Sequence, residues 1–157
     1  MSAGYSIQRF GDAARLDELH SFVHDAFRDL PIDPPSSVLK ETPAHFAERL
    51  RTDTIFAASA SGQLIGSIFC TPKPAELYIG RLAVRPDWRR RGVASALVDA
   101  AKDEAQRRGA KRMTLGARIA LPGNVALFRR HGFVVARETR HEGFTTPTSY
   151  DMELVLV

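Results

Sequence analysis

The segment "LAVRPDWRRRGVASALVDAAKDEAQRRG", residues 82–109, passes from an apolar strand through a basic turn into a long helix. The strand is predicted over 75–84, "AELYIGRLAV", because it has hardly any polar face, as is typical of a strand in the centre of a sheet. The helix is predicted because small and apolar residues recur every four positions, at Val93, Leu97, Ala101 and Ala105. Gly109 is its expected end.

The basic turn combines several features of an anion-binding site. The first N–H groups of a helix have no partner within the helix, and with the helix dipole they attract anions. Gly92 and Ala94 leave the backbone open to contact, the arginines at 89–91 add positive charge, and Ser95 could donate one more hydrogen bond. Cations at a helix N-terminus cost about 0.3–1 kcal/mol each. Three of them therefore favour a bound anion over the alternative, a solvated charged surface.

The remaining segments are predicted to add further strands and helices around this unit. Apolar runs predict strands over residues 5–10, 54–60, 63–72, 111–117, 133–140 and 149–157, with a hairpin turn at Ser61-Gly62. Caps and apolar periodicity predict helices after Asp12, after Thr42-Pro43 and over 122–132, and three prolines within 29–39 predict an irregular loop. The order β-α-α-β-β-β-α-β-α-β-β predicts an α/β fold of the layered α+β type. It has a mixed, mostly antiparallel central sheet with a parallel pair in the middle and flanking helices.

Length and composition are those of one soluble domain over residues 1–157. No apolar run approaches the roughly 18 residues of a membrane span, and the first segment shows no secretion signal. The single cysteine, Cys70, cannot form an internal disulfide, which fits a reducing cytoplasm. It is expected in the core. The absence of CxxC and HExxH patterns argues against a metal site, and that of GxxxxGK[ST] and GxGxxG against nucleotide hydrolysis and dinucleotide binding. A net charge of +4 favours an anionic partner.

Two segments together resemble the GNAT family of N-acetyltransferases. The first follows the family pattern Arg/Gln-x-x-Gly-x-Gly/Ala, here Arg89-x-x-Gly92-x-Ala94. The second, "NVALFRRHGF" at 124–133, has the family's asparagine and small residue followed by an aromatic residue, a basic residue and Gly-Phe. The resemblance covers residues 76–135 closely. It implies a GNAT-like fold and acetyl-CoA as the acetyl-donor cosubstrate.

The resemblance also implies which positions bind the cofactor. Strand backbone would pair with the pantetheine arm as an extra strand does, at Leu82, Ala83 and Val84. Main-chain N–H groups of the turn would hold the pyrophosphate, at Arg89, Arg90, Arg91, Gly92, Val93, Ala94 and Ser95. Three side chains would also meet the cofactor. Asn124 would contact the cofactor arm, Phe128 would lie near the thioester sulfur, and Arg130 would bind a phosphate. A solvated surface role is the alternative for Arg130.

Acetyl transfer requires the acceptor amine to lose its proton, because a lysine-like amine is neutral in only roughly 1 part in 2,500 at pH 7. Tyr78 occupies the position at which the family often has a glutamate that acts as the base. Glu76 lies two residues earlier on the same strand face. Glu76 is the preferred base, with an exposed carboxylate at a strand start as the alternative, and Tyr78 would relay a proton or line the pocket. Phe128 replaces the family's usual tyrosine acid, so His131 or Tyr150 would protonate the thiolate, or it leaves unaided.

These observations predict an enzyme that moves acetyl to a primary amine of a small molecule or peptide by direct attack in a ternary complex. The acceptor is expected between the loop at 28–42 and the segment 140–152. One alternative is a non-catalytic acyl-CoA sensor, which the replacement of the family's tyrosine by Phe128 leaves open. The other is a basic nucleic-acid-binding domain, although no docking motif is present. No nucleic-acid or membrane partner is expected, and a homodimer paired through an exposed final strand is a further expectation.

Overall fold

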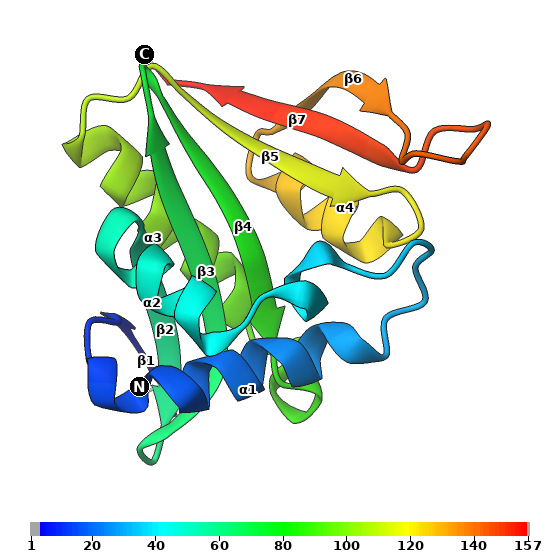
Figure 1. Ribbon diagram of the computed structural model, residues 1–157. Coiled ribbons are helices and arrows are strands. Elements are labelled where there is room, and N and C mark those ends of the chain that lie inside the picture. The colour runs from blue at the N-terminus through cyan, green and yellow to red at the C-terminus, as the bar shows by residue number, and fades with distance from the viewer. Residues whose placement is uncertain (1–3, 157) are drawn as a thin grey trace.

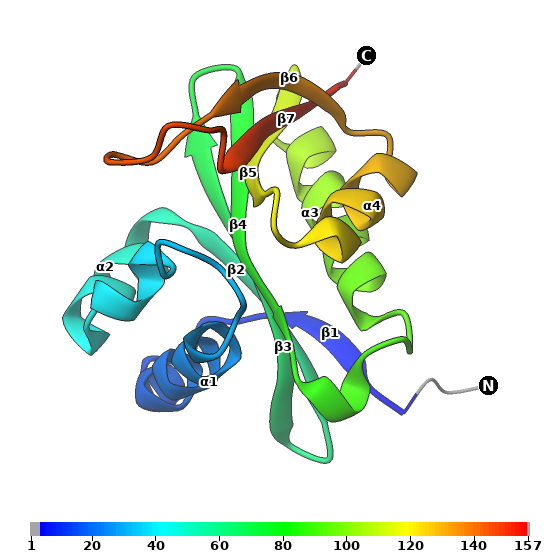
Figure 2. The ribbon, with the colours of Figure 1, turned by 90° about the vertical axis from the view of Figure 1, so that its right-hand side faces the viewer.

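A seven-stranded sheet lies between two pairs of helices in the computed structural model, which describes residues 4–156 (Figures 1 and 2). The strands are β1 (Ser6–Arg9), β2 (Thr54–Ala60), β3 (Gln63–Lys73), β4 (Glu76–Val84), β5 (Arg112–Arg118), β6 (Val134–Thr139) and β7 (Ser149–Val155). The α-helices are α1 (Leu16–Arg28), α2 (Pro43–Thr52), α3 (Val93–Arg107) and α4 (Pro122–Arg130), and short 3₁₀ turns occupy Ala13–Arg15, Ser37–Lys40 and Pro86–Trp88. Within the described residues, no helix is both long and apolar enough to cross a membrane.

The strand order is β1-β2-β3-β4-β5-β7-β6, and only β4 and β5 pair in parallel. Helix α3 makes the crossover between these two strands, as a parallel connection requires. The predicted order of elements and the mixed sheet with a central parallel pair are therefore confirmed.

The prediction of an exposed final strand is wrong. The hairpin of β6 and β7 inserts β7 between β5 and β6, where it pairs with both neighbours. The edges of the sheet are β1 and β6 instead. The strand predicted over 149–157 is found at Ser149–Val155, and Val157 lies outside the described residues.

Each face of the sheet has its own apolar core. Figure 2 shows α1 and α2 on one side of the sheet and α3 and α4 on the other. The periodic residues of α3 are all buried against the second face, together with Cys70. Leu19 and Val23 of α1 are buried against the first face, where Phe46 of α2 joins them. Because helices cover both faces of the central strands, the sequence of β4 is almost wholly apolar.

Strands β4 and β5 pair only at their beginnings and then diverge (Figure 1). Their register joins residues 76–78 to residues 112–114, and no further pairs follow among the described residues. A bulge in β4 opposite β3 bends the strand here, with Arg81 at a φ of 52° and the Ser67 hydroxyl donating to its carbonyl. The β5-facing edge of residues 79–84 is consequently left without a strand partner.

Candidate active site

Two adjoining cavities occupy the space where β4 and β5 diverge. The turn cavity, of about 460 Å³, reaches the basic turn and the start of α4. The loop cavity, of about 400 Å³, lies beneath the α1–α2 loop, residues 29–42. Leu82 and Asn124 line both cavities, so a long molecule in one would reach the other.

The turn cavity gathers predicted cofactor residues from four parts of the chain. They come from β4, the basic turn, α3 and α4, and are Leu82, Ala83, Val84, Arg89, Ala94 and Asn124. The strand residues bring the unpaired edge of β4, which can donate and accept main-chain hydrogen bonds as an open strand does.

The backbone of the basic turn contains two residues in the left-handed conformation. Arg90 and Gly92 both have left-handed φ angles, of 62° and 82°. Gly92 is the N-cap of α3 and supplies no side-chain cap. The first main-chain bond into α3 is from the Ala96 N–H to the Gly92 carbonyl, at 2.9 Å. The N–H groups of residues 93–95 therefore have no partner within the helix. The Arg89 N–H, by contrast, already donates to Pro86 at 3.3 Å.

The side chains of the turn differ in what they do. Arg89 lines the turn cavity, Arg90 is exposed, and the Arg91 guanidinium lies over the Trp88 ring, 4.5 Å from its centroid. Ser95, expected to help bind an anion, is instead 2.7 Å from Nε2 of His131 through its hydroxyl oxygen.

His131, one candidate acid, lies between α3 and α4 rather than at a cavity. Its Nδ1 is 3.5 Å from the Asp99 carboxylate, and its carbonyl accepts a hydrogen bond of 2.7 Å from Lys102. Burial and the charge of Lys102 lower the pKa of His131. The expectation that His131 protonates the thiolate is corrected on this geometry, which makes the residue a link between helices.

The loop cavity is lined by further predicted site residues and by residues that were not predicted. Tyr78 and Phe128 line it, beside the shared residues Leu82 and Asn124. Phe128 is nearly buried and packs edge-on against Phe133. Both regions expected to meet the acceptor contribute to the lining. The α1–α2 loop supplies residues 34–37, and the segment 140–152 supplies His141 and Ser149.

Glu76 shares the face of Tyr78 as expected, but it is not part of the lining of either cavity. Its carboxylate accepts a hydrogen bond of 2.5 Å from the Thr114 hydroxyl and one of 3.2 Å from Arg112. These hydrogen bonds, the one from Thr114 first, lower the pKa of Glu76. A carboxylate stabilised in this way is a weaker base.

Tyr150, the other candidate acid, lines neither of the two cavities. It pairs with Ala117 and packs against the core beneath α3 and α4. Because side chains alternate along a strand, its neighbour Ser149 faces the loop cavity instead. Arg130 is exposed on α4 and lines neither cavity.

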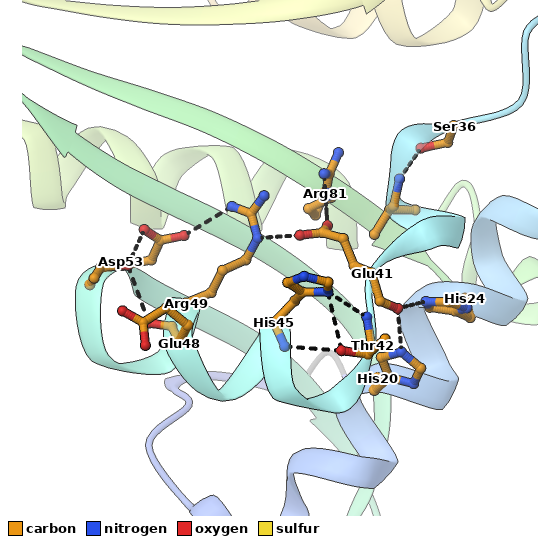
Figure 3. Close-up of polar contacts among 12 residues, drawn as sticks. His20, His24, Ser36, Glu41, Thr42, His45, Glu48, Arg49, Asp53 and Arg81 are labelled. Carbon is orange, nitrogen blue, oxygen red and sulfur yellow. Dashed lines mark hydrogen bonds and ion pairs between the residues drawn. The ribbon is translucent and has the colours of Figure 1, made fainter.

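Sequence reasoning overlooked two arginines that line the loop cavity, Arg81 and Arg118. Glu41 pairs with Arg81 at 2.8 Å and with Arg49 at 2.8 Å, as Figure 3 shows. Burial alone would raise the pKa of Glu41, but hydrogen bonds and charges from Arg49 and Arg81 outweigh it and lower the pKa. The Glu41 carbonyl also lies 2.8 and 2.9 Å from Nε2 of His20 and His24, so the α1–α2 loop is held to α1 and to β4. Arg118, at the end of β5, contacts the loop at the Pro35 carbonyl.

Comparison with known proteins identifies this arrangement. Residues 16–133 match the acetyltransferase (GNAT) family. N-alpha-acetyltransferase MAK3 of Arabidopsis thaliana is 33% identical over 90 residues, which are 55% of this chain and 47% of the relative. The match therefore spans about half the length of that relative.

Two solved structures show the same fold. PaiA N-acetyltransferase from Thermoplasma acidophilum, in complex with coenzyme A, is 15% identical with a TM-score of 0.83, covering 99% of this chain and all of that one (100%). Ribosomal-protein-alanine N-acetyltransferase from Brucella melitensis is 16% identical with a TM-score of 0.75, covering 96% and 99%.

Proposed function

Because the chain belongs to the GNAT family of acetyltransferases, we propose that it moves an acetyl group from acetyl-CoA to a primary amine of a small molecule or peptide. The amine attacks the thioester directly while both substrates are bound, and residues 1–157 act as one cytoplasmic domain. The observation that carries the proposal is the pair of adjoining cavities. One meets the open N–H groups at the start of α3, and the other lies beneath the α1–α2 loop.

In this proposal the turn cavity takes the donor. The pyrophosphate binds the N–H groups of residues 90–95, with Arg89 as a charged side chain beside it. The pantetheine arm pairs with the open edge of β4 at 82–84 and passes Asn124, which leads the thioester toward Phe128. Coenzyme A in the similar PaiA structure supports acetyl-CoA as the donor. Arg130 stays a predicted phosphate contact, for which its exposure leaves room.

The diverging strands also supply electrostatic stabilisation for the reaction. A main-chain N–H of β4 just after the bulge, near Ala83 or Val84, donates to the oxygen that becomes negative in the tetrahedral intermediate. Phe128 offers no proton to the leaving thiolate, whose ordinary pKa near 8.5 allows it to leave unaided.

For the base, we place His141 ahead of Glu76. Burial and the charge of Arg118 lower the pKa of His141, so its imidazole is neutral at pH 7 and can accept a proton within the cavity it lines. Tyr78 lines the same cavity as a hydroxyl partner for the amine. His141→Gln should slow transfer by about 10²-fold or more at pH 7 and leave acetyl-CoA affinity unchanged. An equal rate in wild type and His141→Gln, with a slower Glu76→Gln, would return the role to Glu76.

The proposed function is tested by thermal unfolding and thiol release. Acetyl-CoA at 100 times its dissociation constant should stabilise the fold by about 2.7 kcal/mol, and a panel of amines should then release coenzyme A. Stabilisation without thiol release on any amine would favour the acyl-CoA sensor, which the replacement of a tyrosine acid by Phe128 keeps as second candidate. No stabilisation, with salt-dependent DNA binding, would refute the proposal.

A further inference from the structure

We propose that the acceptor is a small amine that also carries a carboxylate, and that Arg118 binds this carboxylate in the loop cavity. This inference rests on the proposed function and deepens it, because it names the class of the acceptor. The observations that carry it are the position of Arg118 and the charges that line the cavity around it.

Arg118 is a half-buried cation without a carboxylate partner among the described residues. It lines the loop cavity from the last position of β5, and its Nη2 donates only a long hydrogen bond of 3.4 Å to the Pro35 carbonyl. Burial lowers the pKa of the Arg118 guanidinium, and the more distant charge of Asp33 offsets this only in part. Most of the planar donor fork is therefore available, and a carboxylate is the group that it fits in a bidentate manner.

The rest of the cavity lining has the same sign of charge. Besides Arg118, its charged residues are Lys40 and Arg81, and no aspartate or glutamate is among the described lining residues. Glu41 neutralises Arg81, since both hydrogen bonds of that guanidinium end on the Glu41 carboxylate (Figure 3). Arg118 and Lys40 remain as the uncompensated charges. A polyamine would meet repulsion here, whereas an anionic group would supply the missing counter-charge.

The covering of the cavity favours a small molecule. Pro34, Pro35 and Ser36 of the α1–α2 loop lie over it, and the contact of Arg118 with the Pro35 carbonyl joins the loop to β5. The loop is fixed at its other end by the contacts of Glu41 with β4 and α1. An amine one to a few bonds from its carboxylate can thus reach the thioester near Leu82 and Phe128 while Arg118 holds the carboxylate.

The test compares matched pairs of amines that differ only in the carboxylate. Leucine is set against leucinamide and phenylalanine against phenethylamine, with spermidine and a peptide with a free N-terminus as further acceptors. Thiol release gives kcat/KM for each. The expected result is a preference of about 10-fold or more for the carboxylate in each pair. Equal rates within the pairs, or a preference for spermidine or the peptide, would overturn the inference while leaving the proposed function intact.

Variants assign the preference to Arg118. Arg118→Gln should reduce kcat/KM about 10–100-fold for the amine of each pair that carries a carboxylate. The kcat/KM for the amine without the carboxylate should change less than about threefold. Arg118→Lys should keep part of the preference, because it retains the charge without the fork. Arg137→Gln is the charge-matched control, since Arg137 lies on the edge strand β6 and pairs there with Asp151. Equal losses for both members of a pair in Arg118→Gln would assign Arg118 a structural role and overturn the inference.

A binding measurement separates this inference from the proposed function. N-acetylleucine, added with coenzyme A, should raise the unfolding temperature of wild type but not of Arg118→Gln, whether or not any amine is turned over. N-acetylphenethylamine, which lacks the carboxylate, serves as the control ligand. Stabilisation by both ligands alike, or by neither, contradicts an anion site at Arg118. Thiol release that fails while N-acetylleucine binds would refute the proposed function alone.

Discussion

Gly92 meets two physical requirements of the basic turn. It adopts an unusual backbone conformation, and it leaves the backbone surface uncovered. Its φ of 82° is one that L side chains adopt only at a cost, of about 1–2 kcal/mol. Space is not limiting, because the nearest atom to an added Cβ would be the Tyr5 hydroxyl at 4.0 Å. A side chain at this position would therefore act on whatever approaches the turn from outside.

Gly92→Glu should raise the dissociation constant for acetyl-CoA about tenfold or more, because it places a negative charge beside the proposed pyrophosphate site. Isothermal calorimetry on the folded variant measures the effect. Gly109→Glu is a matched control at the other end of α3, with a φ of 69° and open space around it. It carries the same backbone strain but should keep the affinity within about twofold. Equal losses in the two variants would show that strain, not the anion site, is responsible.

At the scale of elements, local patterns predicted what local physics decides. The cap at Thr42-Pro43, the hairpin turn at Ser61-Gly62 and the apolar stripe of α3 are found as expected, since each depends on neighbouring residues. Asp12 caps the 3₁₀ turn at 13–15 rather than α1 itself, which begins one turn later. The predicted boundaries were otherwise close.

Features that depend on distant parts of the chain were not predictable in this way. The place of β7 beside β5 depends on how a hairpin docks, which no property of 149–157 reveals. Tyr150 packs against the core because of its register opposite Ala117 of β5, and the strand's own sequence does not give that register. Arg118 was overlooked because its significance comes from the loop that folds over it, from residues 83 positions earlier.

At the scale of the whole molecule, Glu104 links the end of α3 to the sheet. It is buried, and it accepts hydrogen bonds from Arg108 at 2.7 Å and from the Thr54 hydroxyl of β2 at 2.9 Å. Burial alone would raise the pKa of Glu104, but the bonds from Arg107, Arg108 and Thr54 outweigh it and hold the pKa at about 2. The carboxylate thus contributes stability above its ordinary pKa of 4.5, and this contribution is lost as the pH falls toward 2.

Glu104→Gln should lower the free energy of unfolding by about 2–3 kcal/mol at pH 7. The difference from wild type should shrink between pH 5 and pH 2, because the wild-type carboxylate takes up a proton on unfolding in that range and glutamine does not. Urea unfolding at several pH values measures it. Glu48→Gln, which removes an exposed pair with Arg51, should cost about 0–1 kcal/mol. A penalty for Glu104→Gln that is the same at pH 3 and pH 7 would contradict the assignment.

The burial of Cys70 has a practical consequence. It is the only cysteine of the chain, it is fully enclosed, and burial together with the charges of Glu104 and Asp53 raises its pKa to about 12. A thiol in that state stays protonated and resists alkylating dyes and disulfide reagents while the protein is folded. Because Cys70 does not react, a fluorophore would label only the cysteine introduced by Ser37→Cys. The arrival of the acceptor beneath the α1–α2 loop could then be followed in real time without first removing a native residue.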